Sequence, residues 1–287
     1  MPLRGTLPGM RSSYREHPAP TGLAGVVACV WRNETTATRQ LRVLPDGCMD
    51  LIWMNGAVHV AGPDPRAFLT TMGPRQVVTG LRFRPGAAPG VLGVPAWALR
   101  DQRLHLEDLW PGTTVSQRIA EVSNPAVGLA AVVAARVTEP DLALSAVLSQ
   151  LQTGSSVAAT AAALGWTERT LHRRCRDVFG YGPSVLRRIL RFRLALRVAG
   201  QGVSFVATAA RAGYADQAHL AREVRALAGV PLGQLIAGKR AYPPDTGDMS
   251  ARHTVQVSRT HHAGQPDTPG RGVKRSTGRP SGSCTTA

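Results

Sequence analysis

The chain has 287 residues, of which 43% are hydrophobic and 18% charged, enough for one large folded domain or two ordinary ones. Its 34 lysine and arginine residues against 18 acidic ones give a formal net charge of +16, which favours nucleic acid or an anionic membrane surface as partner. No stretch reaches the roughly 18 apolar residues of a membrane span, and the N-terminus lacks a signal-peptide pattern, so we expect no membrane segment. The four cysteines form no CxxC pair, which disfavours a zinc ribbon or a disulfide framework and favours reduced thiols in the cytoplasm.

The two ends of the chain have almost no apolar periodicity. Residues 1–18 are interrupted by proline and glycine, and residues 243–287 are rich in Gly, Pro, Ser, Thr and Arg. Such compositions bury too little apolar surface to offset the entropy of ordering the chain. Both ends are therefore predicted to be disordered, the second as a basic tail.

Between residues 19 and 112, short apolar runs alternate with turn signals. The runs at 26–31, 51–54, 58–60 and 77–83 are predicted strands. Asn55-Gly56 lies between two of them and is typical of a two-residue hairpin turn. We therefore expect a small antiparallel β-rich domain.

Helical spacing of apolar residues begins after this region. Residues 113–139 carry apolar side chains three or four positions apart, and residues 140–152 continue the pattern. The first segment is predicted to form helices that connect two domains. The second is predicted to begin the C-terminal domain.

The positive charge is concentrated in one block. Residues 155–242 hold 14 basic and 4 acidic residues, a net charge of +10, whereas residues 1–154 hold 14 and 11, a net charge of +3. This block is less than a third of the chain but carries most of its excess positive charge. Such a distribution is typical of a domain that binds a polyanion.

The same block contains one pattern twice. Each copy has a serine, a small-residue helix, a glycine followed by an aromatic residue, and a second helix with an inward leucine. Ser156 and Ser204 are 48 residues apart, and Leu171 and Leu220 are 49 apart. The serines, Thr167 and Asp216 suit helix N-caps, and Gly165 and Gly213 can adopt the positive φ of a tight turn. Each copy is therefore predicted to be a helix-turn-helix, whose second helix enters the major groove of DNA.

A predicted helix from Pro183 to Ala199 joins the two copies. Proline suits its first turn, and an apolar stripe with surrounding arginines follows. A helix of this length spans roughly 25 Å. It can hold two reading helices about one duplex turn, ~34 Å, apart.

Residues 140–238 closely resemble the C-terminal domain of the AraC/XylS family of bacterial transcription regulators. The resemblance rests on Gly165-Trp166, Gly180-x-x-Pro183, the linker run 191–195, and Gly213-Tyr214-x-Asp216-Gln217-x-His219-Leu220-x-Arg222. Cys175 and Val224 stand where the family often has Phe, and Leu186 and Leu235 where it often has Tyr, but all four substitutes are apolar. The resemblance implies an α+β protein: a small β-rich N-terminal domain, then an all-α domain (140–242) with two helix-turn-helix units and a linker helix.

The resemblance also assigns candidate DNA-binding residues. They are Arg169, His172, Arg173 and Arg176 in the first unit, and Gln217, Arg222 and Arg225 in the second. Arginine can bind a guanine edge with two hydrogen bonds, and glutamine an adenine edge. For each arginine, a phosphate contact or a solvated position is the alternative interpretation. Asp216 fits a helix cap, and His219 fits a structural residue of the turn.

The segments 45–52 and 80–88 are similar to an N-terminal domain of unassigned role that often precedes AraC-type regions. That similarity implies effector sensing or dimerisation. Double-stranded DNA is the expected partner; RNA polymerase, a small-molecule effector and a second copy of the chain are further candidates. We expect a cytoplasmic protein with no cofactor, no metal and no membrane partner.

The sequence leaves two alternatives to a sequence-specific transcription factor. One is a non-specific architectural DNA binder. The other is a DNA-alkylation repair protein with Cys48 as acceptor, but Asp46 and Asp50 would raise the pKa of that thiol. His59 and His105 show no partner for general-base or metal chemistry in the sequence. An enzyme is therefore not expected.

Overall fold

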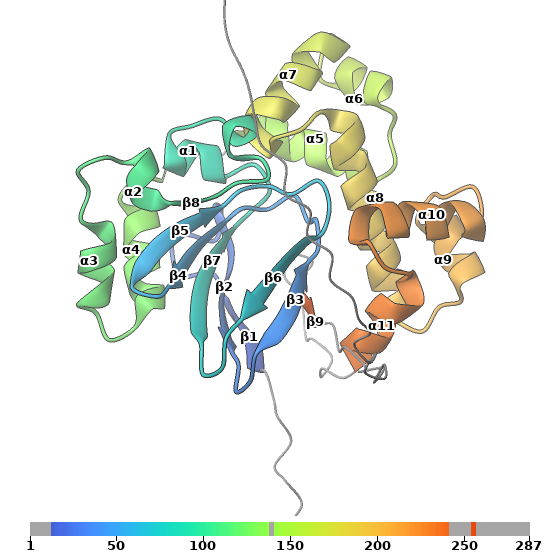
Figure 1. The fold of residues 1–287 in the computed structure, drawn as a ribbon. Helices are drawn as coiled ribbons and strands as arrows, with labels where there is room; N and C mark the ends of the chain where they lie inside the picture. The colour runs from blue at the N-terminus through green and yellow to red at the C-terminus, as the bar shows by residue number, and fades with distance from the viewer. Residues whose placement is uncertain (1–12, 138–140, 241–253, 257–287) are drawn as a thin grey trace, which may run out of the picture. The chain divides into compact units, whose positions relative to one another are not determined.

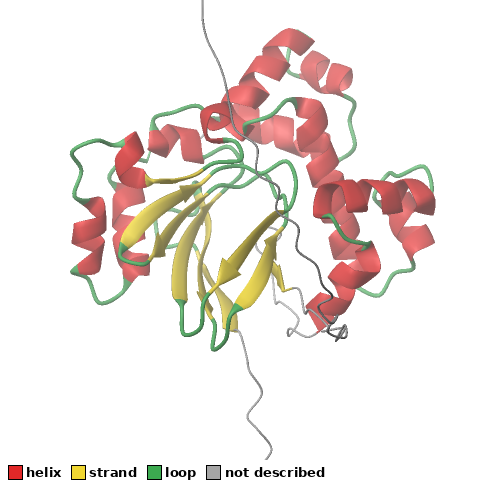
Figure 2. Cartoon of the chain, viewed as in Figure 1, coloured by secondary structure: helices red, strands yellow, loops and turns green. Residues whose placement is uncertain are grey.

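The computed structural model describes residues 13–137, 141–240 and 254–256. Its N-terminal elements are, in chain order, β1 (Ser13–Pro18), β2 (Val27–Glu34), β3 (Arg39–Val43), β4 (Asp50–Met54), β5 (Ala57–Ala61), β6 (Phe68–Met72), β7 (Val77–Phe83), α1 (Ala88–Leu92), the 3-10 helix η1 (Ala96–Leu99), β8 (Arg103–His105), α2 (Leu106–Leu109), α3 (Val115–Ala120) and α4 (Pro125–Ala134). The helices α5 (Leu142–Gln152), α6 (Val157–Ala163), α7 (Glu168–Phe179), α8 (Pro183–Gly200), α9 (Phe205–Arg211), α10 (Gln217–Ala228) and α11 (Leu232–Arg240) follow, and a short strand β9 (Thr254–Gln256) comes last. The fold is thus α+β, a β-rich domain followed by a helical one, as predicted (Figures 1 and 2).

Six strands form an antiparallel sheet in the order β1-β2-β7-β4-β5-β8. A second sheet has the order β6-β3-β9. The predicted hairpin at Asn55-Gly56 is confirmed: β4 and β5 pair on either side of it, and the two residues have φ of 53° and 79°. Positive φ at both positions defines the turn whose twist matches that of paired strands.

The central strand β7 is buried along almost its whole length. Its Gly80 lies under the indole ring of Trp31 on β2, and a Cβ at this position would come within 2.1 Å of the ring. The absence of a side chain therefore allows the indole to lie flat on the neighbouring strand. Gly80 is thus the position at which β7 accommodates the Trp31 side chain of β2.

The helices expected to connect the two domains belong instead to the N-terminal domain. Helices α3 and α4 lie within the segment 113–139, and α4 packs on β7 and β4 while α3 packs on β5. Ile119 and Leu129 are buried in the same core as Leu51 and Leu81 of the sheet. The segment therefore does not form a bridge: its helices cover an apolar face of the sheet, in a core to which α1 and α2 also contribute Val91 and Leu106.

The predicted disorder at the N-terminus also needs correction. Residues 13–18 form β1, which pairs with β2 from Ser13 opposite Glu34 to Pro18 opposite Cys29. Tyr14 contacts the Trp31 ring, with ring centroids 5.9 Å apart. Residues 1–12 and most of 243–287 lie outside the described residues, but β9 within that tail pairs with β3.

Candidate nucleic-acid interface

Helices α6 and α7 form the first helix-turn-helix unit. Ser156 caps α6 by accepting a hydrogen bond from the N–H of Ala159, and Thr167 caps α7 in the same way for Thr170. Gly165 between the helices has φ of 66°. The caps satisfy N–H groups that the helix itself leaves unpaired, so both helix starts are defined by the sequence. Both predicted caps and the predicted turn are confirmed.

Helices α9 and α10 repeat this geometry. Ser204 caps α9, and Asp216 caps α10 by accepting a hydrogen bond from the N–H of His219. Gly213 has φ of 72°. His219 accepts a hydrogen bond from the N–H of Ala215 through Nδ1, and its ring meets the Tyr214 ring edge to face. The structural roles predicted for Asp216 and His219 are therefore confirmed.

These caps predict a measurable effect on stability. Asp216→Ala should lower the free energy of unfolding by about 1 kcal/mol, because the first turn of α10 loses the acceptor for a backbone N–H. Asp216→Asn keeps that acceptor and should remain close to wild type. Urea denaturation of the three proteins measures the difference, and equal losses in both variants would contradict the capping role.

Helix α8 carries both units. Leu186, Ile189 and Leu190 in its first half pack with Leu171 and Cys175 of α7. The second half contributes Phe192, Ala195, Leu196 and Ala199 to a separate core that holds Leu220 and Val224 of α10. The four residues that differ from the family pattern, Cys175, Leu186, Val224 and Leu235, are all fully buried. Figure 1 shows the two units at opposite ends of α8.

The second unit is also fixed to α8 by polar contacts. Arg188 donates two hydrogen bonds to the Glu223 carboxylate of α10, at 2.9 and 3.2 Å. The hydrogen bonds from Arg188 lower the pKa of Glu223. The Arg191 guanidinium lies over the Tyr214 ring, 4.2 Å from its centroid. No local sequence pattern predicts these contacts, because the partners are 35 and 23 residues apart.

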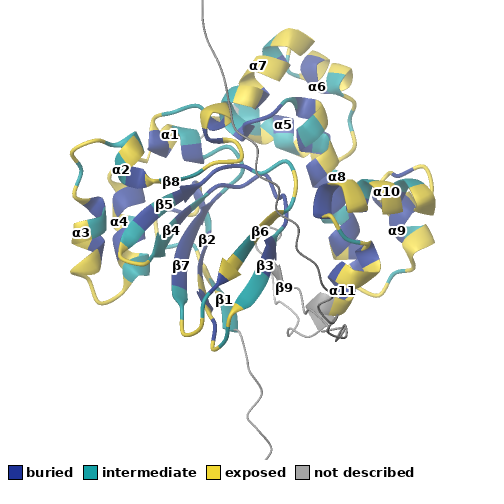
Figure 3. Cartoon of the chain, viewed as in Figure 1, coloured by how far each residue is buried: buried dark blue, intermediate teal, exposed yellow. Residues whose placement is uncertain are grey.

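The sequence-predicted DNA-binding residues all lie on exposed positions of α7 and α10 (Figure 3). They are Arg169, His172, Arg173 and Arg176 on α7, and Gln217, Arg222 and Arg225 on α10. The two ends of α7 nevertheless differ. Arg169 and Arg173 lie on its N-terminal turns, whereas Arg176 near its end lies over the Trp97 ring, 5.8 Å from the centroid. The His172 ring lies against Gly182, where a Cβ would be 2.6 Å from Nε2.

The N-terminal domain supports the C-terminal ends of both helices. Gly180, which ends α7, lies against Pro63 and Ala96. At the end of α10, Arg42 of β3 donates a hydrogen bond of 2.6 Å to the carbonyl of Ala228. The N–H of Ala67 donates to the carbonyl of Leu227. A buried cation at a helix C-terminus is also favourable for the helix dipole. The N-terminal turns, which in helix-turn-helix proteins read base edges, remain open.

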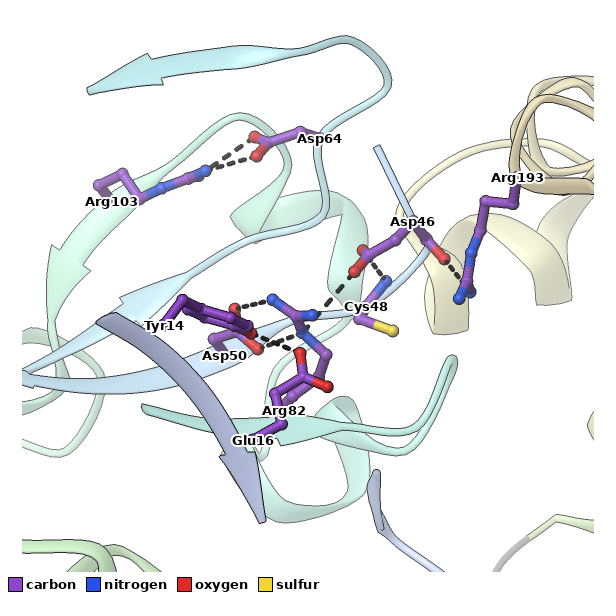
Figure 4. Close-up of polar contacts among 9 residues, drawn as sticks. All are labelled: Tyr14, Glu16, Asp46, Cys48, Asp50, Asp64, Arg82, Arg103 and Arg193. Atoms are coloured by element: carbon purple, nitrogen blue, oxygen red, sulfur yellow. Dashed lines mark hydrogen bonds and ion pairs between the residues drawn. The ribbon is translucent and has the colours of Figure 1, made fainter. Parts of the chain in front are cut away.

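A buried ionic cluster lies where the two domains meet (Figure 4). Arg82 of β7 donates hydrogen bonds of 3.0 and 3.1 Å to the Asp50 carboxylate and lies 3.7 Å from Asp46. The carbonyl of Asp46 accepts a hydrogen bond from Arg193 of α8, at 3.1 Å. Burial raises the pKa of Asp50 although Arg82 opposes it, and the carboxylates raise the pKa of Arg82. The linker helix is thereby joined to the core of the N-terminal domain.

Cys48 lies beside this cluster and does not have the surroundings of a reactive thiol. Its side chain is buried, and burial, followed by the charge of Asp46, raises its pKa well above the ordinary value. The carboxylates of Asp46 and Asp50 thus act on the Cys48 thiol in the direction expected from the sequence. His59 and His105, which looked isolated in the sequence, face each other across β5 and β8 with ring centroids 4.5 Å apart. Within the described ranges, no three His, Cys, Asp or Glu residues are grouped to hold a metal ion.

These features define a DNA-binding transcription regulator. Residues 160–237 match the family model of a helix-turn-helix domain, and residues 15–105 match a domain of unknown function, DUF6597. The chain thus carries a C-terminal helix-turn-helix domain of the AraC type behind an N-terminal domain of unassigned role. No helix in the described part of the chain has both the length and the apolar character to span a bilayer.

Solved structures similar to this chain include two crystal structures of ToxT from Vibrio cholerae. An apo variant from strain SCE256 is 10% identical, with a TM-score of 0.39, and the match covers 73% of this chain and 96% of that one. A second ToxT structure is 11% identical with a TM-score of 0.38, and the match covers 72% of this chain and 95% of that one. A comparison with curated proteins gave no match.

Proposed function

We propose that this protein regulates transcription by binding a specific DNA sequence, with α7 and α10 in successive major grooves. The observation that carries the proposal is the attachment of two capped reading helices to opposite halves of one continuous helix. The 18 residues of α8 make a rod about 27 Å long. That length is comparable to the ~34 Å between equivalent major-groove positions on one face of the duplex.

The exposed side chains have distinct roles in this proposal. Arg169 and Arg173 on the open turns of α7 bind guanine edges, and Gln217 at the start of α10 binds an adenine edge. Arg222 contacts the major groove in which α10 lies. His172, Arg176 and Arg225 lie where a phosphate or groove contact is the simpler role. Arginine–phosphate contacts supply much of the affinity, so binding should weaken steeply as salt rises.

Arg169→Ala tests this division of roles. We expect it to cost roughly 1–3 kcal/mol on the preferred sequence and to relax selection at one base position, because a bidentate contact to a base is lost. Arg187→Ala on α8 is the matched control and should weaken all sequences equally, if it has any effect. Binding to randomised DNA, followed by sequencing of the bound fraction, measures both. Equal weakening of every sequence by Arg169→Ala would assign that residue to a phosphate.

Competition between a selected site and random DNA tests the proposal as a whole. A specific regulator binds its site about 10³-fold or more tightly than random sequence. Equal affinity for both would instead identify a non-specific architectural DNA binder. Promoter fragments from the protein's own genome are the natural starting pool for this selection.

For the N-terminal domain we propose effector sensing that controls the DNA-binding domain in the cytoplasm. Its contacts with the ends of α7 and α10 support this role, because any ligand that changes those contacts changes how the reading helices are held. The domain also has apolar side chains open to solvent at Val122 and Val127, which are 40% and 61% exposed. These residues are where self-association, the other function implied by the resemblance, would occur.

A further inference from the structure

The segment 62–67, which joins β5 to β6, is anchored on the N-terminal domain. Gly62 lies so close to the backbone of Leu99 that a Cβ would come within 1.6 Å of the Leu99 carbonyl oxygen. The Asp64 side chain is 9% exposed and pairs with Arg103 of β8 through both carboxylate oxygens (Figure 4). These contacts give the segment a fixed position on the sheet.

The same segment is also stiff. Two of its six residues are prolines, Pro63 and Pro65. Proline fixes its own φ at about −65° and restricts the residue before it. At the end of the segment, Arg103 lies over the ring of Phe68, the first residue of β6, 4.2 Å from the centroid. Few conformations are therefore open to the chain between β5 and β6.

This segment touches the C-terminal ends of both reading helices. Near its start, Pro63 lies against Gly180, the glycine that ends α7, where a Cβ would be 2.5 Å from the proline Cγ. At its end, the N–H of Ala67 donates a hydrogen bond of 2.7 Å to the carbonyl of Leu227, in the last turn of α10. That carbonyl is one of the last four of the helix, which have no partner within it. Helices α7 and α10 are thus connected a second time, by a route that does not pass through α8.

Other residues of the N-terminal domain reinforce the contact with α10. Arg42 of β3 donates a hydrogen bond of 2.6 Å to the carbonyl of Ala228. Leu44, just after β3, is buried in the same core as Phe192 of α8 and Leu220 of α10. The second unit is therefore held on the N-terminal domain by an apolar contact as well as by hydrogen bonds.

A second connection matters because the two units have separate cores. Helix α8 alone would carry the orientation of one unit to the other, and helices of this kind bend. A small bend or twist of α8 changes both the distance and the angle between α7 and α10. With segment 62–67 in place, the same bend would have to break its contacts with Gly180 or Leu227.

We propose that segment 62–67 is a brace that sets the spacing and the relative rotation of the two reading helices, so that the N-terminal domain helps to select the distance between the two halves of the DNA site. Its residues are positioning residues and need not touch DNA. The inference rests on the proposed function, in which α7 and α10 occupy successive major grooves. One inserted base pair moves the second half-site by about 3.4 Å and turns it by roughly 35°. Braced helices cannot follow such a change without losing base contacts.

Two variants loosen the brace without altering any candidate DNA-binding residue. Pro63→Gly combined with Pro65→Gly removes its stiffness. Ala67→Pro removes the N–H group that holds α10. The matched control is Pro74→Gly combined with Pro111→Gly, two exposed prolines in other loops of the N-terminal domain. Urea denaturation establishes that each protein is folded under the conditions of the test.

The first measurement is DNA affinity as a function of half-site spacing. The DNA is the site that the wild type selects, with its own spacing and with one base pair inserted or removed between the halves. The wild type and the control should lose about tenfold or more with each change, the cost of one lost base contact, whereas the brace variants should lose about threefold or less. Base preference within each half should stay the same in all proteins.

The second measurement tests the brace without DNA. Arg173→Cys and Ala221→Cys place spin labels on exposed positions of α7 and α10. Cys284→Ser removes the one native cysteine outside the described residues, and the other three are buried. Double electron–electron resonance should give a broader distribution of label distances when Pro63→Gly and Pro65→Gly are added, and an unchanged one with the control substitutions.

Three results would overturn the proposal. They are equal widths of the distance distributions, a wild type that binds all spacings equally, and brace variants whose affinity changes by the same factor on every spacing. Each of them leaves sequence-specific DNA binding standing. A wild type that prefers no sequence would instead overturn the proposed function, and the label distances would still decide whether segment 62–67 holds the two helices.

Discussion

Replacing Arg82 by methionine should lower the free energy of unfolding by about 3–5 kcal/mol, the range for breaking a buried ion pair by removing one partner. Arg82 is 2% exposed and makes two hydrogen bonds to Asp50. Methionine fills much of the same volume but leaves the Asp50 carboxylate buried without its counter-charge. Urea denaturation at pH 7 measures the loss.

Arg32→Met is the matched control for this substitution. Arg32 also pairs with a carboxylate, Glu34, but their side chains are 50% and 48% exposed. Exposed pairs contribute little because water screens them. The free energy of unfolding of Arg32→Met should therefore stay close to that of the wild type. An equal loss of stability in both variants would contradict the role given to burial.

The pH dependence gives Arg82→Met a second signature. Without Arg82, the pKa of buried Asp50 should rise further above its ordinary value, so the folded variant binds a proton more tightly than the unfolded chain. The resulting stabilisation is fully present below the unfolded pKa of Asp50, about 4, and is lost as pH rises through the folded pKa. The deficit relative to wild type should therefore be smaller near pH 4 than at pH 7.

Phe192→Ala should have an effect of similar size, about 3–5 kcal/mol, because it leaves a large cavity in a packed core. Phe192 is fully buried in the second half of α8, in the core that holds Leu220 and Val224 of α10. Loss of this packing loosens α10 on the linker helix. We therefore expect reduced stability together with weaker binding to specific DNA.

Phe205→Ala supplies the comparison for Phe192→Ala. Phe205 begins α9 and is 36% exposed, so its removal leaves no closed cavity. Guanidinium denaturation and DNA titration of the two variants measure both quantities. Equal destabilisation by the two substitutions would show that the linker helix is not the structural centre of the second unit.

Much of the DNA-binding domain could be predicted because its signals are local. Serine, threonine and aspartate caps act within three residues, and the turns at Gly165 and Gly213 need only a positive φ. Because the pattern occurs twice, each copy supports the interpretation of the other as a helix-turn-helix. The positions of the candidate DNA-binding residues on α7 and α10 follow from the same helical periodicity.

The N-terminal domain was predicted less completely, because its edge strands and covering helices depend on distant partners. β1 carries few apolar residues and gains its order by pairing with β2 and by the contact of Tyr14 with Trp31. Helices α3 and α4 carry apolar residues three or four positions apart, and α4 contains no charged residue at all. Nothing in that periodicity says whether the apolar face packs on the sheet or on the helical domain.

By itself, the sequence determined the two capped helix-turn-helix units, the helix that joins them and the concentration of positive charge in that region. These depend on contacts within about ten residues and on composition, which are readable along the chain. The tertiary structure alone decided that Arg82, Asp46 and Arg193 form one chain of contacts, and that segment 62–67 reaches the ends of both reading helices. Burial of one apolar core brings such residues together from more than a hundred positions apart, and no local pattern encodes which of them will meet.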